Sequence, residues 1–249
     1  MKKTSLIGFL IIGNEILSGR TAEKNLPALA KILQTRGLHI NELLIVRDLQ
    51  KDIVAALNHL LSSCDYVFTS GGIGATHDDI TTAAVAAYLK LAVEENPEML
   101  ALLSRFCKNR GLPITAVRRR MALAPKGANA VLSDFPGAPG YAINNILVCA
   151  GVPSIFAVMA AAAAKSIPTG KPFFSQTLMV ECPESDFAEA LAVVQESYNE
   201  VEIGSYPRDD GDIFYCHLIF GGTDKKKITA AKEKTEEWLK SNRINHATI

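Results

Sequence analysis

Residues 65–82 constrain the fold of this chain most, because a short apolar strand runs there into a glycine-rich loop. Residues 66–68 form an aromatic and β-branched run, which is typical of a buried strand. Gly71, Gly72 and Gly74 follow, and two adjacent carboxylates precede the next apolar run. Proteins build phosphate cradles from a strand, a glycine-rich turn and a helix start.

This loop has a binding interpretation and a purely structural one. Its glycines can present bare backbone N–H groups to an anion, which makes them candidates for substrate binding. Glycines also occur in ordinary tight turns, and an Asp before an apolar run is often a helix N-cap. We expect Asp78 or Asp79 to cap a helix that begins near Ile80.

The composition limits the class of protein. The chain has 249 residues, of which 48% are hydrophobic, and a formal net charge of zero, as expected for one large or two modest domains. The balanced charge gives no support to nucleic-acid binding. The five cysteines are odd in number and contain no C-x-x-C pair, so neither a disulfide framework nor a zinc site is indicated. A reducing, cytoplasmic location is expected.

Two apolar segments imitate targeting signals. Residues 1–12 combine basic residues with an apolar run, as a secretory signal does, but no small-x-small cleavage site follows. We interpret residues 6–12 as a central parallel strand. The alanine run at 160–164 is far shorter than the roughly 20 residues that span a membrane, so no membrane partner is expected.

Two more loops are expected at the same edge of the sheet as the glycine-rich loop. The strand at 6–12 leads into Glu15 and Ser18, and a strand at 40–46 ends at Asp48. Open α/β sheets bind ligands at the carboxyl ends of their strands, so these side chains are candidate ligand contacts. The alternatives are a solvated Glu15 and a helix N-cap at Asp48.

Asn25 is expected to cap a helix over residues 26–36.

The Ile167 to Pro172 segment contains two prolines and a glycine, which predicts a domain boundary there. Beyond it the elements are expected in the order βαββαβ, a ferredoxin-like pattern.

The residues from Gly71 to Thr81, GGIGATHDDIT, resemble the signature GGxGPTxDDxT. This signature is that of the competence-damage-inducible protein A (CinA) branch of the molybdopterin-binding (MoaB/Mog-type) superfamily. The N-terminal domain of animal FAD synthase is similar. Ala75 stands where the branch usually has Pro. Asp48 matches the acidic residue that the superfamily carries after its second strand.

Other segments carry the same resemblance. Residues 13–19 are similar to the motif G-[TDN]-E-[IL]-L-x-G, and residues 118–128 to N-R-K-Q-A-x-x-P-x-G-A. Residues 138–141 resemble APGF, and residues 203–208 contain a GSYP segment. Residues 150–154 are similar to P-G-x-P-x-E, with Ala150 in place of the first Pro. The resemblance therefore covers nearly the whole chain.

The resemblance implies a three-layer α/β/α domain with a mostly parallel sheet over residues 1–167. A small α+β domain of the ferredoxin-like type follows over residues 173–249. It also implies a divalent-metal-dependent nucleotide pyrophosphatase of the ADP-ribose or FAD class. Asp48, Asp78 and Asp79 would then act in catalysis and hold Mg²⁺, Mn²⁺ or Co²⁺, because such cations prefer oxygen ligands.

The candidates for substrate binding come from the three loops and from the later motifs, where arginines suit phosphate contact. They are Gly13, Glu15, Ser18, Asn25, Gly71, Gly72, Gly74, Thr76, Arg119, Arg120, Gly151 and Pro153.

Two other functions stay open. One is adenylyl transfer to molybdopterin, which uses a similar phosphate cradle. The other is a non-catalytic pterin or nucleotide binder, which the departures at Ala75, Ala150 and Ser154 keep open. In each case the partner is a small molecule. The sequence leaves open whether the chain forms a homo-oligomer.

Overall fold

The chain forms two compact units, Met1–Gly170 and Lys171–Ile249, in a computed structural model. The structure describes residues 4–133, 137, 139–209 and 214–249. The basic start of the signal-like segment and the first residue of the APGF-like motif lie outside these ranges. Each unit is described by itself.

The first unit is built on a six-stranded sheet with the order β2-β1-β3-β8-β7-β6. The four parallel strands are β1 (Ile7–Ile12), β2 (Ile40–Val46), β3 (Tyr66–Ser70) and β8 (Ile146–Cys149). The strands β7 (Tyr141–Ile143) and β6 (Asn129–Ala130) pair antiparallel. All six residues of β1 are buried, as its continuous apolar run predicts. The mostly parallel sheet is confirmed.

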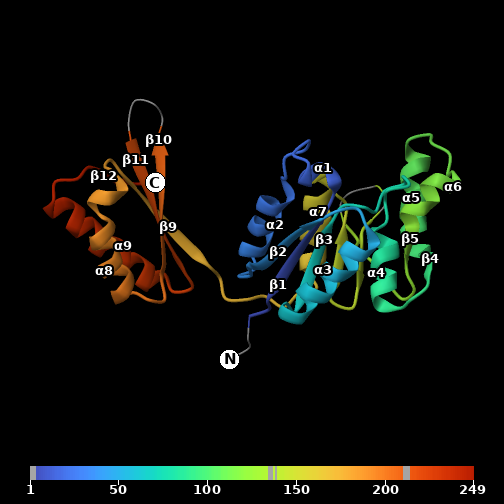
Figure 1. Ribbon diagram of the computed structural model, residues 1–249, viewed down its shortest axis with the longest axis horizontal. Coiled ribbons are helices and arrows are strands. Elements are labelled where there is room, and N and C mark those ends of the chain that lie inside the picture. The colour runs from blue at the N-terminus through green and yellow to red at the C-terminus, as the bar shows by residue number, and fades with distance from the viewer. Residues whose placement is uncertain (1–3, 134–136, 138, 210–213) are drawn as a thin grey trace. The chain divides into compact units, whose positions relative to one another are not determined.

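Helices cover both faces of this sheet (Figure 1). On one face α2 (Asn25–Gln34) and α7 (Pro153–Ala164) pack on Phe9 and Ile11 of β1. On the other face α3 (Gln50–Ser63) and α4 (Thr81–Leu89) pack on Leu10 and Ile12. Alternate residues of one strand thus face opposite layers, which gives the predicted α/β/α arrangement.

Smaller elements extend the first unit. The helix α1 (Asn14–Leu17) follows β1 directly. The strands β4 (Val93–Glu95) and β5 (Leu123–Pro125) form an antiparallel pair. Between these two strands lie α5 (Pro97–Asn109), α6 (Ala116–Arg119) and a 3₁₀ helix (Arg120–Ala122).

The predicted N-caps at Asn25 and at Asp78 or Asp79 are wrong, and so is the alternative of an N-cap at Asp48. The N-caps of α2, α3 and α4 are Lys24, Leu49 and Ile80, and none of these side chains makes a capping hydrogen bond. For α2, the carboxylate of Glu23 accepts instead from the backbone N–H groups of Asn25 and Leu26. The side chains of Asn25, Asp48, Asp78 and Asp79 make other contacts, which are described with the site.

The second unit has the predicted βαββαβ order. Its elements are β9 (Phe174–Val180), a 3₁₀ helix (Glu184–Asp186), α8 (Ala188–Ser197), β10 (Glu202–Asp209), β11 (Phe214–Gly222), α9 (Lys225–Ser241) and β12 (His246–Thr248). The antiparallel sheet has the order β10-β11-β9-β12, which is ferredoxin-like. Its core lies between the sheet and the two α-helices, where Leu178, Leu218 and Leu239 are fully buried.

The last residues of the first unit are tied to it by hydrogen bonds. The Arg36 guanidinium donates to the Ile167 carbonyl at 2.9 Å, and the Gly170 N–H donates to the Arg36 carbonyl at 2.9 Å. No helix among the described residues combines the length and the apolar character needed to cross a membrane.

We predict that residues 1 to 170 fold when expressed alone, because these residues contain both cores of the three-layer unit. Circular dichroism should show one cooperative thermal transition. An unfolded fragment, or one that melts without cooperativity, would contradict the division into two independent units.

Candidate functional site

A cavity of about 610 Å³ opens at the carboxyl edge of the first unit's sheet. The loops after β1, β2, β3 and β8 form much of its wall, as expected for ligand sites of open α/β sheets. Leu103 and Phe106 of α5, Met121 from the 3₁₀ helix after α6, and Gly137 and Pro139 also line it. Its size is within the range of small-molecule sites.

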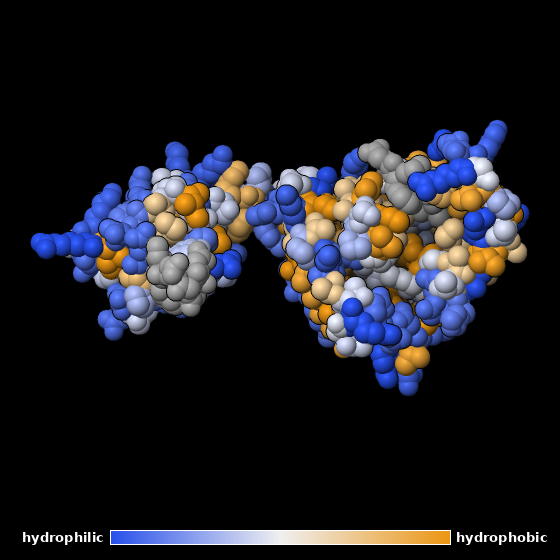
Figure 2. Space-filling model, turned by 90° about the horizontal axis from the view of Figure 1, so that it is seen from above, coloured by the Kyte–Doolittle hydropathy of each residue, from blue (hydrophilic) through white to orange (hydrophobic). Residues whose placement is uncertain are grey.

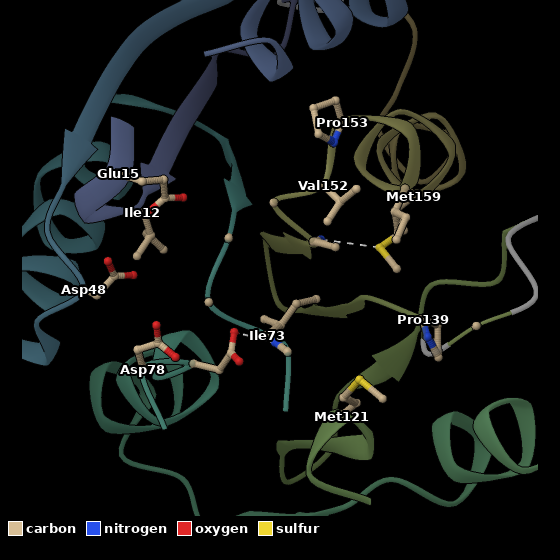
Figure 3. A pocket seen from close by; sticks show the side chains of 18 of the residues that line it. Ile12, Glu15, Asp48, Ile73, Asp78, Met121, Pro139, Val152, Pro153 and Met159 are labelled. Atoms are coloured by element: carbon tan, nitrogen blue, oxygen red, sulfur yellow. Dashed lines mark hydrogen bonds between the residues drawn. The ribbon is translucent and has the colours of Figure 1, made fainter. Parts of the chain in front are cut away.

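The cavity has an acidic side and an apolar side. Figure 3 shows Glu15, Asp48 and Asp78 on one side and Met121 and Met159 on the other. In Figure 2, hydrophobic and hydrophilic residues both border the hollow of this unit. No Lys or Arg is among the described residues that line the cavity. We call this cavity the edge pocket.

Asp48 connects the loops after β1 and β2. Its Oδ2 accepts from the Asn14 N–H at 2.7 Å, and the Gly13 N–H donates to the Val46 carbonyl at 3.1 Å. The carboxylate therefore stabilises the start of α1 rather than that of α3. Glu15 is placed on the edge pocket by the same turn.

Asp79 folds the glycine-rich loop around its carboxylate. Oδ1 accepts from the Gly74 N–H at 2.6 Å, and Oδ2 accepts from the Thr76 N–H at 2.7 Å and from the Thr76 hydroxyl at 2.6 Å. Asp78 Oδ1 also lies within hydrogen-bond distance of this hydroxyl, so the two carboxylates share its single hydrogen. The hydrogen bond with Thr76 holds the pKa of the Asp78 carboxyl below its usual value, so that Asp78 is ionised at neutral pH.

Gly71 and Gly72 have backbone conformations that other residues rarely adopt, with φ of 104° and 70°. A Cβ on Gly71 would overlap the Ile12 carbonyl, and one on Gly72 would overlap the Thr81 hydroxyl. The N–H groups of Gly71 and Gly74 already donate, at 3.2 Å to the Cys149 carbonyl and at 2.6 Å to Asp79. The expectation that the glycine N–H groups are bare is therefore wrong for these two.

The structure brings most of the predicted site residues together and leaves some outside. Those that line the edge pocket are Glu15, Asp48, Gly71, Gly72, Gly74, Asp78, Asp79, Gly151 and Pro153. Those that do not line it are Gly13, Ser18, Asn25, Thr76, Arg119 and Arg120.

Several of the residues outside the edge pocket have structural contacts. Asn25 is buried, and its amide donates to Ser70 Oγ at 2.7 Å and to the Gly151 carbonyl at 2.8 Å. It therefore holds the start of α2 against the ends of β3 and β8. Both guanidinium contacts of Arg119 go to the Glu95 carboxylate at 2.8 Å, so Arg119 does not point toward a ligand in the edge pocket.

Sequence reasoning missed the apolar side of the edge pocket. Leu103 and Phe106 stand three residues apart on α5, a spacing that is typical of any helix face packed on a core. Met159 is almost fully buried on α7, and its sulfur accepts from the Ala150 N–H at 3.5 Å (Figure 3). No sequence signal separates these side chains from ordinary core residues.

The described residues contain no group of three or more His, Cys, Asp or Glu side chains arranged to hold a metal ion. Mg²⁺ is commonly bound by only one or two carboxylates together with waters and substrate phosphates. Burial raises the pKa of the Cys149 thiol at the end of β8 to about 12, which disfavours the thiolate form of this cysteine.

The fold and the edge pocket define an α/β protein with a small-molecule site at a sheet edge. Residues 8–169, more than half of the chain, match the family model described as "Probable molybdopterin binding domain". The chain therefore belongs to the molybdopterin-binding-domain family. Residues 172–248 match the model described as the FAD synthase middle domain.

Individual relatives agree with this assignment. A protein of Archaeoglobus fulgidus is 30% identical over 94% of this chain and 99% of its own length. A CinA-like protein of Desulfosudis oleivorans is 31% identical over 58% of this chain and 36% of its own length. The crystal structure of CinA from Thermoplasma acidophilum is 26% identical, with a TM-score of 0.57 over 65% of this chain and 97% of that one. These similarities support the predicted CinA branch.

We predict that Gly72→Ala lowers the free energy of unfolding by about 3 kcal/mol. Position 72 has a positive φ, and the added Cβ would overlap the Thr81 hydroxyl. Gly127→Ala is the matched control, since Gly127 has φ of 85° but open space around its Cβ position, and should cost about 1 kcal/mol. Chemical denaturation measures both. Equal losses would show that the contact with Thr81 does not constrain the loop.

Proposed function

We propose that this protein hydrolyses nucleotide pyrophosphates of the ADP-ribose or FAD class with the help of a divalent cation. One observation carries the proposal. The edge pocket has an acidic side and an apolar side, and no Lys or Arg is among the described residues that line it. The acidic side suits a cation and a diphosphate together, and the apolar side suits a flat ring system.

A diphosphate alone would be repelled by the acidic side. Two like charges 4 Å apart near a protein surface repel by about 4 kcal/mol. A divalent cation between carboxylates and phosphate oxygens reverses the sign of this interaction, and it also spreads the charge that develops during hydrolysis. The absence of Lys and Arg from the described lining therefore favours a substrate that binds with its metal.

In this proposal Asp48 and Asp78 are the carboxylates that hold the cation, and Glu15 lies beside them. One of the carboxylates orients the attacking water or removes its proton. The positive end of α7, which begins at Pro153 on the edge pocket, favours the negative charge of the phosphates. The side chains of Phe106, Met121 and Met159 pack against the ring of the substrate.

The family description favours a second candidate, adenylyl transfer to molybdopterin or simple pterin binding. The apolar side of the edge pocket would accommodate a pterin ring in the same way as a nucleobase. Release of a mononucleotide from ADP-ribose or FAD distinguishes hydrolysis from both alternatives, and transfer of an adenylyl group to molybdopterin distinguishes the transferase from a binder.

We predict that Asp48→Asn lowers metal-dependent turnover on the order of a hundredfold, because the amide keeps an oxygen but loses the charge that attracts the cation. The Asn oxygen can still accept from the Asn14 N–H, so thermal stability should change little. Hydrolysis of ADP-ribose and FAD with Mg²⁺, Mn²⁺ and Co²⁺ measures the effect.

Asp52→Asn is the matched control, since Asp52 lies nearby on α3, pairs with Arg47 and does not line the edge pocket. It should leave turnover unchanged. Full activity of Asp48→Asn with every metal would disprove the catalytic role of Asp48. If the wild-type protein turned over neither substrate with any metal, the non-catalytic binder would replace the hydrolase.

A further inference from the structure

We infer that Asp79 is a positioning residue, which folds the glycine-rich loop so that Asp78 faces the cation, and that Asp79 is not itself a ligand of the cation. The inference rests on the proposed function for the role of Asp78. It separates two neighbouring carboxylates that the sequence alone presents as equivalent.

The contacts of the two carboxylates differ. Each oxygen of Asp79 receives one backbone N–H group, at 2.6 and 2.7 Å, and Asp79 shares the single hydrogen of the Thr76 hydroxyl with Asp78. The Asp78 carboxylate contacts the Thr76 hydroxyl and the backbone N–H of its own residue. Backbone N–H donors on both oxygens of Asp79 use part of the acceptor capacity of each oxygen, which leaves less of it for a cation than in a carboxylate with a free oxygen. Asp78 is therefore the better ligand.

Gly74 and Thr76 are the two residues whose backbone N–H groups bond the Asp79 carboxylate. A Cβ on Gly74 would lie 2.6 Å from Asp79 Oδ2, closer than a real side chain tolerates. The absence of a side chain at position 74 thus lets the carboxylate reach the backbone of its own loop. The Thr76 hydroxyl lies against both carboxylates, so the position of Asp78 depends on the fold that Asp79 imposes.

Asp48 provides a useful contrast. It also accepts from a backbone N–H, but only through Oδ2. No described residue donates to its Oδ1, so this oxygen can bind a cation while the other holds the loop after β1. Asp48 can both position and bind, whereas both oxygens of Asp79 are used within its loop.

Amide hydrogen exchange, followed by NMR on the full chain, tests the positioning role without any assay of activity. In Asp79→Asn one carboxylate oxygen is replaced by an NH₂ group, which cannot accept from an N–H. We expect exchange at Gly74 or Thr76 to become about tenfold faster. Asp78→Asn is the matched control and should leave exchange at Gly74 within about twofold, because Asp78 accepts from no backbone group of Gly74 or Thr76.

Mn²⁺ affinity, measured with the metal alone by titration, tests whether Asp79 is a ligand. We expect Asp78→Asn to weaken Mn²⁺ binding about tenfold or more, and Asp79→Asn to weaken it less than about threefold, as loss of a charge outside the coordination shell would. A loss in Asp79→Asn as large as that in Asp78→Asn would overturn the inference. Unchanged exchange in Asp79→Asn would overturn it as well.

These measurements separate the inference from the proposed function. If Asp78→Asn and Asp48→Asn both kept full Mn²⁺ affinity, the proposed cation site would be wrong. The statement that Asp79 positions Asp78 to bind a cation would then be wrong as well. The exchange data would then still show whether Asp79 folds the loop.

Discussion

Parallel pairing of the central strands is the constraint on which the site depends. Because β1 lies between β2 and β3, and β3 pairs with β8, the loops that follow all four strands meet at one edge of the sheet. No single loop could form the edge pocket. Hydrogen bonds between the loops then fix their shapes, with Asp48 linking the first two and Asn25 linking the last two.

Two of the carboxylates at this edge have a structural role, besides the chemical role that we propose for the site. Asp48 accepts from the first N–H of α1, and Asp79 accepts from the N–H groups of Gly74 and Thr76 in the glycine-rich loop. These bonds hold the start of α1 and the turn of the glycine-rich loop in place. In the function that we propose, a diphosphate substrate brings a cation to these carboxylates.

Much of the fold could be predicted from the sequence, because apolar runs and turn residues have a strong local signature. The continuous run of β1, the loop from Gly71 to Asp79 and the βαββαβ order of the second unit are examples. The partners of side chains could not be predicted. Arg119 has the charge that suits a phosphate, but Glu95 is the residue beside it, and that contact depends on the pairing of β4 with β5.

The location of the cation tests the central claim most directly. Crystals of the full chain grown with Mn²⁺ and ADP-ribose would show the metal by anomalous scattering. We predict one Mn²⁺ in the edge pocket, bound by oxygens of Asp48, Asp78 and the diphosphate, with Asp79 still hydrogen-bonded to Gly74 and Thr76. A diphosphate bound in the edge pocket without a metal, or a metal held by Asp79, would contradict this account.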